Sequence, residues 1–561
     1  MKRYIFPKLL CLTLALGLMP LVAEAQESNI EVVTTYTPDI APATKLLAPT
    51  VIADDPRYDP DITYQVNPSI WQISLDSHNF NPARASYWDY TSYKRLFAKA
   101  AASYPLGSEA RIRYTMQTPK VGYFGVGVDH VGDFAARKGV GGVKHSIADS
   151  YSMSNEASVI GGLFVGRYLL DGALKYDNDI FNGYAMMDPY RFVYHDADLK
   201  VRFGDEFVDF SRLNFAVEAH AGLWGHNLPQ DGSHVEKALE YSAGGKVKLA
   251  RNFGKNYISL DLDGDAWKSD YRSELAVGGT VGYARSFGFI SVDAGLGYIF
   301  DRVMTRTKAS HYILPRAKVL FDLDKASFAP YVEISTDVQR NNLNNLFELN
   351  PYIDYSYSPR AIETIDNTVK YNLSLGCTGT LFASRLGYHA YVGATHVQNQ
   401  LFWFVSGPGQ FSVATGGNNR IFVGVGAESM PIAGLKINLG YHYHYDINKS
   451  KYAISESNMR ANLGVEYTLS KWKFNLNGQM LGRRVWSVLP AADAKSEAVS
   501  EPMGEFTMPL CFDLGVSASY RINRMIEVYV NGQNLLNSKI YDFASYYRPG
   551  IGAMAGVKID F

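Results

Sequence analysis

The sequence lacks three features that would each point to a common class of protein. After residue 25 no apolar run approaches 18 residues, which argues against an inner-membrane bundle of helices. Only Cys377 and Cys511 follow that point, so disulfide bonds do not provide the framework. The 54 Lys and Arg residues balance 55 Asp and Glu residues, which gives no indication of nucleic-acid binding or acidic disorder.

The first 25 residues have the pattern of a secretory signal peptide. Lys2 and Arg3 precede an apolar stretch over residues 9–22, and Ala23 and Ala25 are the small residues that a signal peptidase requires. A retained anchor is the alternative, but the apolar stretch is shorter than the roughly 20 residues of a spanning helix. We therefore expect export and cleavage before Gln26.

Aromatic residues are abundant. The chain has 39 Tyr, 29 Phe and 7 Trp, or 13% of all residues. A barrel in the outer membrane needs aromatic girdles at both interfaces, although Tyr-rich soluble β-proteins share this composition.

An apolar and polar alternation with a period of two recurs after Tyr93. In residues 552–561 the apolar side holds Ala, Val, Ile and Phe, and the other side includes Lys558 and Asp560. The same pattern covers residues 290–300, 435–445, 459–469, 512–520 and 526–531. About ten residues is the length with which a tilted strand crosses a bilayer, and Phe561 ends the chain as the closing strand of a bacterial outer-membrane barrel would.

The connections between these segments alternate in length. Counted back from the end, residues 538–548, 483–508, 446–458 and 398–419 form long connections, whereas 523–524, 470–471 and 430–434 form short ones. Outer-membrane barrels have short periplasmic turns and long extracellular loops. Residues 93–561 are therefore predicted to form an all-β, transmembrane antiparallel β-barrel of roughly 20 to 22 strands, with Phe561 at the periplasmic end.

The C-terminal segment resembles a known family. Residues 530–537 read Val-Asn-Gly-Gln-Asn-Leu-Leu-Asn, and Tyr541 and the Pro549-Gly550 step follow before the last strand. This resembles the end of TonB-dependent receptors of the Bacteroidota type, although Ile551 stands where that family often has Arg. The resemblance implies an outer-membrane barrel of about 22 strands that acts in solute uptake, with TonB as a partner.

Residues 26–92 are too few for the globular plug of that family, and no compact α/β pattern emerges from them. Six prolines interrupt this leader, which favours an extended periplasmic or lumen-filling segment. Its apolar cluster over residues 70–75 is a candidate for closing the barrel; pairing at the rim is the alternative. A four-residue sequence near the mature N-terminus resembles the box that engages TonB: Glu31, Val32, Val33 and Thr34.

Polar residues on the inward positions of the strands are candidates for lining the lumen. They are Glu218, His220, Asp261, Asp263, Asp265, His442, His444, Arg460 and Glu466. Residues 261–265 begin like a calcium loop, but Ala266 and Arg272 stand where that loop needs Gly and Glu. A metal site built from His442, His444 and Glu466 is the alternative to solvated histidines. No catalytic constellation and no cofactor motif is found, so we do not expect an enzyme.

Two functions from different classes remain open. The first is solute passage through the barrel, with inward charges setting selectivity. The second is a non-transporting scaffold of a cell-envelope complex, whose leader and loops dock periplasmic or lipoprotein partners. Outer-membrane lipid surrounds the protein in both cases, and nucleic acid is not expected as a partner.

Overall fold

The computed structural model describes most of the chain after residue 94. The described residues are 95–118, 120–137, 150–186, 190–228, 236–269, 272–304, 309–323, 327–353, 365–382, 385–447, 453–488 and 504–561. The predicted signal peptide, the leader and the TonB-box-like residues lie outside them, so these expectations stay predictions. Within the described ranges no helix is long and apolar enough to cross a membrane.

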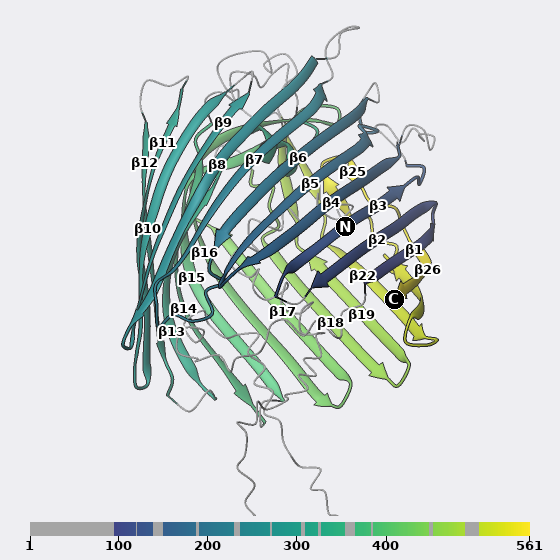
Figure 1. The fold of residues 1–561 in the computed structure, drawn as a ribbon. Coiled ribbons are helices and arrows are strands. Elements are labelled where there is room, and N and C mark those ends of the chain that lie inside the picture. The colour runs from purple at the N-terminus through teal and green to yellow at the C-terminus, as the bar shows by residue number, and fades with distance from the viewer. Residues whose placement is uncertain are drawn as a thin grey trace, which may run out of the picture.

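Twenty-two antiparallel strands form one closed barrel, which confirms the predicted fold class. The wall strands are β1 Leu96–Tyr104, β2 Gly107–Thr118, β3 Gly122–Asp133, β4 Ser152–Val165, β5 Tyr168–Asn182, β6 Arg191–Gly204, β7 Asn214–Leu228, β8 Glu236–Phe253, β9 Asn256–Ser269, β10 Ser273–Phe287, β11 Ile290–Val303, β12 Ser310–Phe321, β13 Ala329–Gln339, β14 Thr368–Leu381, β15 Leu386–Gly407, β16 Gln410–Ile432, β17 Leu435–Asp446, β18 Met459–Leu469, β19 Trp472–Leu481, β22 Cys511–Arg521, β23 Ile526–Gln533 and β26 Gly552–Asp560. Figure 1 shows them running obliquely around the barrel, as closure requires.

The last strand closes the barrel. β26 pairs antiparallel with β23 on one side and with β1 on the other, so Lys558 lies opposite both Glu527 and Lys99. Phe561 and Leu96 exchange backbone hydrogen bonds at the end of the barrel that carries the short turns. That end is periplasmic by the loop-length rule, and no wall strand in the described residues is left with a free edge.

Alternate residues of each strand face lipid and lumen. On β26 the side chains of Val557, Ile559 and Phe561 are exposed on the outer surface, whereas Met554 is buried and Lys558 is half-buried. The outer faces of β14 and β16 are likewise apolar, with exposed Leu373 and Val423 among their residues. The period of two in the sequence thus reports a wall with an apolar outer side and a polar inner side.

Inward-facing rings lie on glycines of the neighbouring strand. Six such pairs stand directly opposite each other in the ladder: Tyr123–Gly162, Tyr331–Gly376, His389–Gly426, Tyr391–Gly424, Phe422–Gly393 and Tyr529–Gly556. A Cβ atom at Gly424 would lie 2.2 Å from Cζ of Tyr391, so the ring occupies the space of the missing side chain. The glycines therefore let large rings lie against the wall and shield its backbone.

We expect Gly424→Ala to destabilise the barrel by about 1 to 3 kcal/mol, because the new methyl group must displace the Tyr391 ring. Gly464→Ala is the matched control, since its nearest neighbouring side-chain atom would be 3.7 Å away. The measurement is the temperature at which the folded band disappears in a heat-modifiability gel. Equal effects of the two substitutions would contradict this account of the glycines.

The connections follow the predicted alternation with one correction. Tight turns occur at residues 470–471 and 433–434, and a short one at residues 522–525. The long connection predicted over residues 398–419 is wrong, because β15 and β16 continue through it to a turn at residues 408–409. The apolar run from Leu401 to Val405 does not alternate because this hairpin tip is buried on both faces.

Candidate functional site

Several extracellular segments fold back into the lumen and pack on one another. They are α4 Leu343–Leu349, β20 Arg484–Val488, β21 Gly504–Met508, β24 Tyr541–Phe543, β25 Tyr546–Tyr547 and the tip of the β15–β16 hairpin. Their apolar side chains form one buried cluster, called the loop core here. Its members are Tyr184, Ala185, Tyr194, Trp224, Ala238, Leu343, Leu346, Phe347, Leu349, Ile353, Ile365, Trp403, Phe411, Val413, Trp486, Met508, Phe543, Ala544 and Tyr546.

The loop core reaches from one side of the wall to the other. Trp224 on β7 packs on Phe347 of α4, with ring centroids 5.0 Å apart. Phe411 in the hairpin tip packs on Trp486 of β20, also at 5.0 Å. β20 is connected directly to β19. In the wall of 22 strands β19 lies twelve strands beyond β7, so the two contacts are anchored on nearly opposite sides of the barrel. The loop core therefore obstructs the extracellular half of the lumen.

Polar contacts fix α4 to the wall. The helix has no side-chain cap of its own, and Glu240 of β8 instead accepts hydrogen bonds from Asn342 Nδ2 at 2.6 Å and the Leu343 backbone N–H at 2.9 Å. The segment between α4 and β14 is also held to the wall, because the side chain of Asn367 donates to Glu274 on β10 and Asp301 on β11. Buried carboxylates with hydrogen-bond donors hold such a segment firmly, because separating them would leave them unsatisfied.

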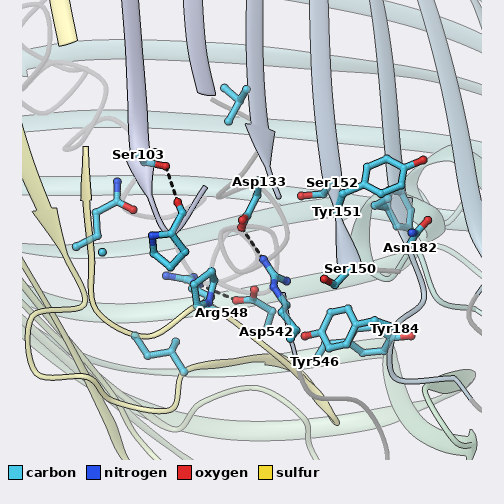
Figure 2. Close-up of a pocket in the computed structure, with 18 of the residues that line it drawn as sticks. Ser103, Asp133, Ser150, Tyr151, Ser152, Asn182, Tyr184, Asp542, Tyr546 and Arg548 are labelled. Atoms are coloured by element: carbon cyan, nitrogen blue, oxygen red, sulfur yellow. Dashed lines mark hydrogen bonds and ion pairs between the residues drawn. The ribbon is translucent and has the colours of Figure 1, made fainter. Parts of the chain in front are cut away.

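A cavity of about 140 Å³ lies between the loop core and the wall near β1, β3, β4 and β5. It is called the rim pocket here. Its ion pairs join Arg137 with Asp133 at 2.5 Å, Arg548 with Asp542 at 2.9 Å and Arg548 with Asp513 at 3.2 Å. Figure 2 shows Asp133, Asp542 and Arg548 around the cavity. Cavities of this size hold one six-membered ring. The rim pocket could therefore hold a small solute, or one ring of a larger solute.

The surroundings of two groups in the rim pocket shift their pKa values. Burial alone would lower the pKa of the Arg137 guanidinium, but the facing Asp133 carboxylate outweighs it and raises the pKa above its usual value. Burial also raises the pKa of Tyr184 to about 12, despite the nearby Arg137. The neutral Tyr184 hydroxyl donates to the carbonyl oxygen of Tyr547 at 3.0 Å and accepts from its N–H at 2.7 Å.

The lumen wall carries charges in register. Asp171, Arg202, Glu218, Lys246 and Asp263 stand opposite one another on β5 to β9, so the sign of the charge alternates from strand to strand. The first two form an ion pair at 3.5 Å. Lys246 is exposed although it faces the lumen, which indicates that this part of the lumen contains water.

The structure places the other acidic candidates on the same wall. Asp261 stands opposite Lys248, and Asp265 accepts a contact from His220 Nε2 at 2.9 Å. The intervening residue on β8 is Gly244, whose absent side chain leaves the space in which His220 and Asp265 meet. These acidic residues therefore stand opposite basic or small residues along the lumen wall and do not form a calcium loop.

The structure separates the residues of the alternative metal site. His442 is opposite Arg460, whereas Glu466 is opposite Lys436 and binds Lys473 at 2.9 Å. Glu466 lies six positions along β18 from Arg460, which corresponds to about 20 Å in an extended strand. No three His, Cys, Asp or Glu side chains in the described residues are grouped to hold a metal ion. The register therefore does not bring His442, His444 and Glu466 together as ligands of one metal ion.

A second charged cluster was not found from the sequence. Arg420 on β16 binds Asp446 at 3.1 Å and Glu456 at 2.8 Å, and Asn418 donates to Asp446 at 2.7 Å. The sequence predicts residues 446–458 only as a long connection, and the fold brings Glu456 to Arg420. Burial alone would raise the pKa of Glu456, but the Arg420 guanidinium outweighs burial and lowers it to about 2.

We expect Glu456→Gln to weaken the docking of residues 453–458 by about 3 kcal/mol at pH 7, because it breaks a buried ion pair. The pKa of Glu456 is lowered from 4.5 to about 2, so the stabilisation is present above pH 4.5 and is lost as the pH falls through about 2. Limited proteolysis of this loop measures the effect, with the exposed Glu505→Gln as control. A difference from wild type that persists unchanged toward pH 2 would contradict it.

The architecture defines the class: an outer-membrane β-barrel of 22 strands whose extracellular segments fold into its lumen. No protein-family model and no curated protein matches the sequence. Several solved structures have a similar fold. The FrpB iron transporter from Neisseria meningitidis (F3-3 variant) is similar with a TM-score of 0.65 and 10% identity, over 84% of this chain and 82% of that one.

Two further solved structures have the same fold. The copper transporter OprC has a TM-score of 0.62 at 12% identity, over 83% of this chain and 81% of that one. The ferric-catecholate import receptor Fiu from E. coli K12 has a TM-score of 0.60 at 10% identity, over 83% and 82% of the chains. The predicted resemblance to TonB-dependent receptors is therefore confirmed for the fold of the barrel.

Proposed function

We propose that this protein takes up a solute across the outer membrane through a lumen that its extracellular loops keep closed. The observation that carries the proposal is the position of the loop core above a water-accessible wall of alternating charge. A barrel that only anchored other proteins would have no need of a charged, hydrated path beneath its obstructed mouth. The rim pocket is the proposed first contact of the solute.

The similar structures support uptake as the class of function. Those proteins are an iron transporter, a copper transporter and an import receptor for ferric catecholates. A barrel of this architecture can therefore move solutes of different sizes inward. In the rim pocket of this chain both arginines pair with carboxylates of the pocket, which distinguishes it from a metal site.

We also propose that opening is driven by TonB through the leader. Glu31, Val32, Val33 and Thr34 would pair with TonB, and residues 26–92 would form a second closure of the lumen from the periplasmic side. β1 supports this arrangement, because it begins at Leu96 on the periplasmic end, where the leader joins the wall.

The test compares the solutes that cells remove from a rich medium. Three strains are needed: one with the wild-type chain, one without it, and one carrying Val32→Pro and Val33→Pro, which prevent strand pairing with TonB. Uptake predicts that at least one solute is depleted only by the wild type. Identical depletion by all three strains, together with co-purification of envelope proteins, would favour the scaffold.

A further inference from the structure

We propose that the tip of the β15–β16 hairpin is the gate of the barrel and that the rim pocket controls it. The tip, residues 400–416, would swing out of the loop core about a hinge at Asn399. The proposal deepens the proposed uptake function and rests on it. It assigns the opening movement to one element of the chain and the trigger to one cavity.

The hinge is a break in the ladder between β15 and β16, and a second break lies within the tip, between Val405 and Gly407. β15 and β16 pair continuously up to Val397 and Asn418, and the register shifts before pairing resumes at Gln400 and Gly416. Two residues of β15 thus oppose Gly417 alone, which makes a β-bulge, and Asn399 has a positive φ of 54°. A bulge bends its strand at this point. Asn399 itself stays tied to the wall, because its Nδ2 donates to the carbonyl oxygen of Asn367 at 3.1 Å and its carbonyl oxygen accepts from the Thr368 hydroxyl at 2.6 Å.

The tip joins the loop core by few backbone contacts. Phe404 and Val405 pair in parallel with Ser487 and Val488 of β20. The N–H of Phe411 donates to the carbonyl oxygen of Tyr352 at 3.1 Å. Phe411 also forms a parallel bridge with Ile353. None of these links belongs to a pair of neighbouring wall strands, so the tip can leave without breaking any such pair.

The same tyrosines hold the tip and line the rim pocket. The hydroxyl of Tyr546 donates to the carbonyl oxygen of Gly409 at the turn of the hairpin, at 2.9 Å. Tyr352 stacks on Tyr546 with ring centroids 3.7 Å apart, and Tyr184 packs edge-on against Tyr546 at 5.0 Å. All three rings line the pocket, and Figure 2 shows Tyr184 and Tyr546 there.

A solute in the rim pocket must therefore touch the rings that seat the tip. Displacing the Tyr546 ring would remove the hydrogen bond to Gly409 and the stack on Tyr352 together. Because the tip and the rim pocket share these side chains, a solute bound in the pocket changes the stability of the tip in its position in the loop core. A solute that binds at the rim would thereby loosen the obstruction beneath it.

The experiment follows a buried reporter in the tip. Ser412 is fully buried, so Ser412→Cys in a Cys377→Ser, Cys511→Ser background reacts with a membrane-impermeant maleimide only when the tip leaves the loop core. A disulfide between Val405→Cys and Val488→Cys, which stand opposite each other, would lock the tip to β20. The control disulfide joins Gly407→Cys and Gln410→Cys within the hairpin itself.

We expect the lock to slow labelling at least tenfold and a reductant to restore it, whereas the control disulfide leaves the rate unchanged. Tyr546→Phe should speed labelling about fivefold by removing one hydrogen bond, and Tyr541→Phe, outside the pocket, should not. Labelling that the lock does not slow, or that both disulfides slow equally, would overturn the gate. Equal rates in the two Tyr→Phe variants would overturn control by the pocket.

Failure of the gate and failure of uptake give different results. Maleimide labelling reports movement of the tip and needs no passage of solute. A gate that behaves as expected in cells that deplete no solute would contradict uptake and leave the movement established. Solute depletion that continues with the tip locked would contradict the gate and leave uptake established.

Discussion

Replacing Phe411 and Trp486 by alanine should open the extracellular mouth while the wall stays folded. The two rings pack on each other and are fully buried in the loop core. Each truncation of a buried aromatic side chain costs about 3 to 5 kcal/mol through lost contacts and the cavity left behind. No pair of neighbouring wall strands depends on either ring, so the loss falls on the packing of the loops.

The measurements are conductance in planar bilayers and sensitivity of cells to large antibiotics. Both should rise in the double variant, and most strongly when residues 26–92 are also deleted, because the leader is the second proposed closure. Phe474→Ala is the control, since this ring faces lipid and is 40% exposed. If the leaderless double variant folds, inserts and still does not conduct, the loop core does not close the barrel.

A charge on the lipid face should prevent assembly, whereas the same charge one residue away should be tolerated. Leu463 on β18 and Val516 on β22 are exposed on the outer surface at the level of the bilayer. An arginine there costs roughly 2 to 4 kcal/mol near the midplane. Asn462 and Ser517 are the adjacent residues on the lumen side, where an arginine meets water.

Heat-modifiable migration and the yield of folded protein in the outer membrane measure assembly. Leu463→Arg and Val516→Arg should lower the yield strongly, and Asn462→Arg and Ser517→Arg should leave it close to wild type. Equal losses in the two pairs would mean that the facing of these strands is wrongly assigned.

The wall was predictable because its signals are local. A strand between lipid and water must alternate along its own sequence, so β26 could be identified from residues 552–561 without knowledge of its neighbours. The strand number also follows from local counting, and the turns at residues 470–471 and 433–434 lie where short connections were expected. The resemblance to TonB-dependent receptors in residues 530–550 indicated the same barrel.

The interior was not predictable in the same way. The tip of the β15–β16 hairpin has no alternation of apolar and polar residues, because protein covers both of its faces. The sequence pattern therefore predicts a long connection where the structure has paired strands. The run from Leu401 to Val405 was the available signal, since five apolar residues in a row are unusual in an exposed connection. No pattern in the sequence joined Phe347 of α4 to Trp224 of β7, whose rings are in contact in the structure.

Polar pairs in the lumen show the same limit. His442, His444 and Glu466 share one side of their strands by sequence, and that side is the lumen side in the structure. Which of them meet depends on register, and the ladder places Arg460 opposite His442 and Lys436 opposite Glu466. The partner of Arg420 comes from a loop, which no alternation could have indicated.

The sequence by itself determined that this chain forms a membrane barrel, its approximate number of strands and the face that each strand turns to lipid, because the bilayer imposes a period of two on every strand. Only the tertiary structure decided what obstructs the lumen and where a solute could bind. Those features depend on the packing of residues such as Trp224, Phe411 and Tyr546, each of which lies more than a hundred positions from the next in the sequence. Their meeting is set by the circumference of the closed wall and by the shift in register at Asn399.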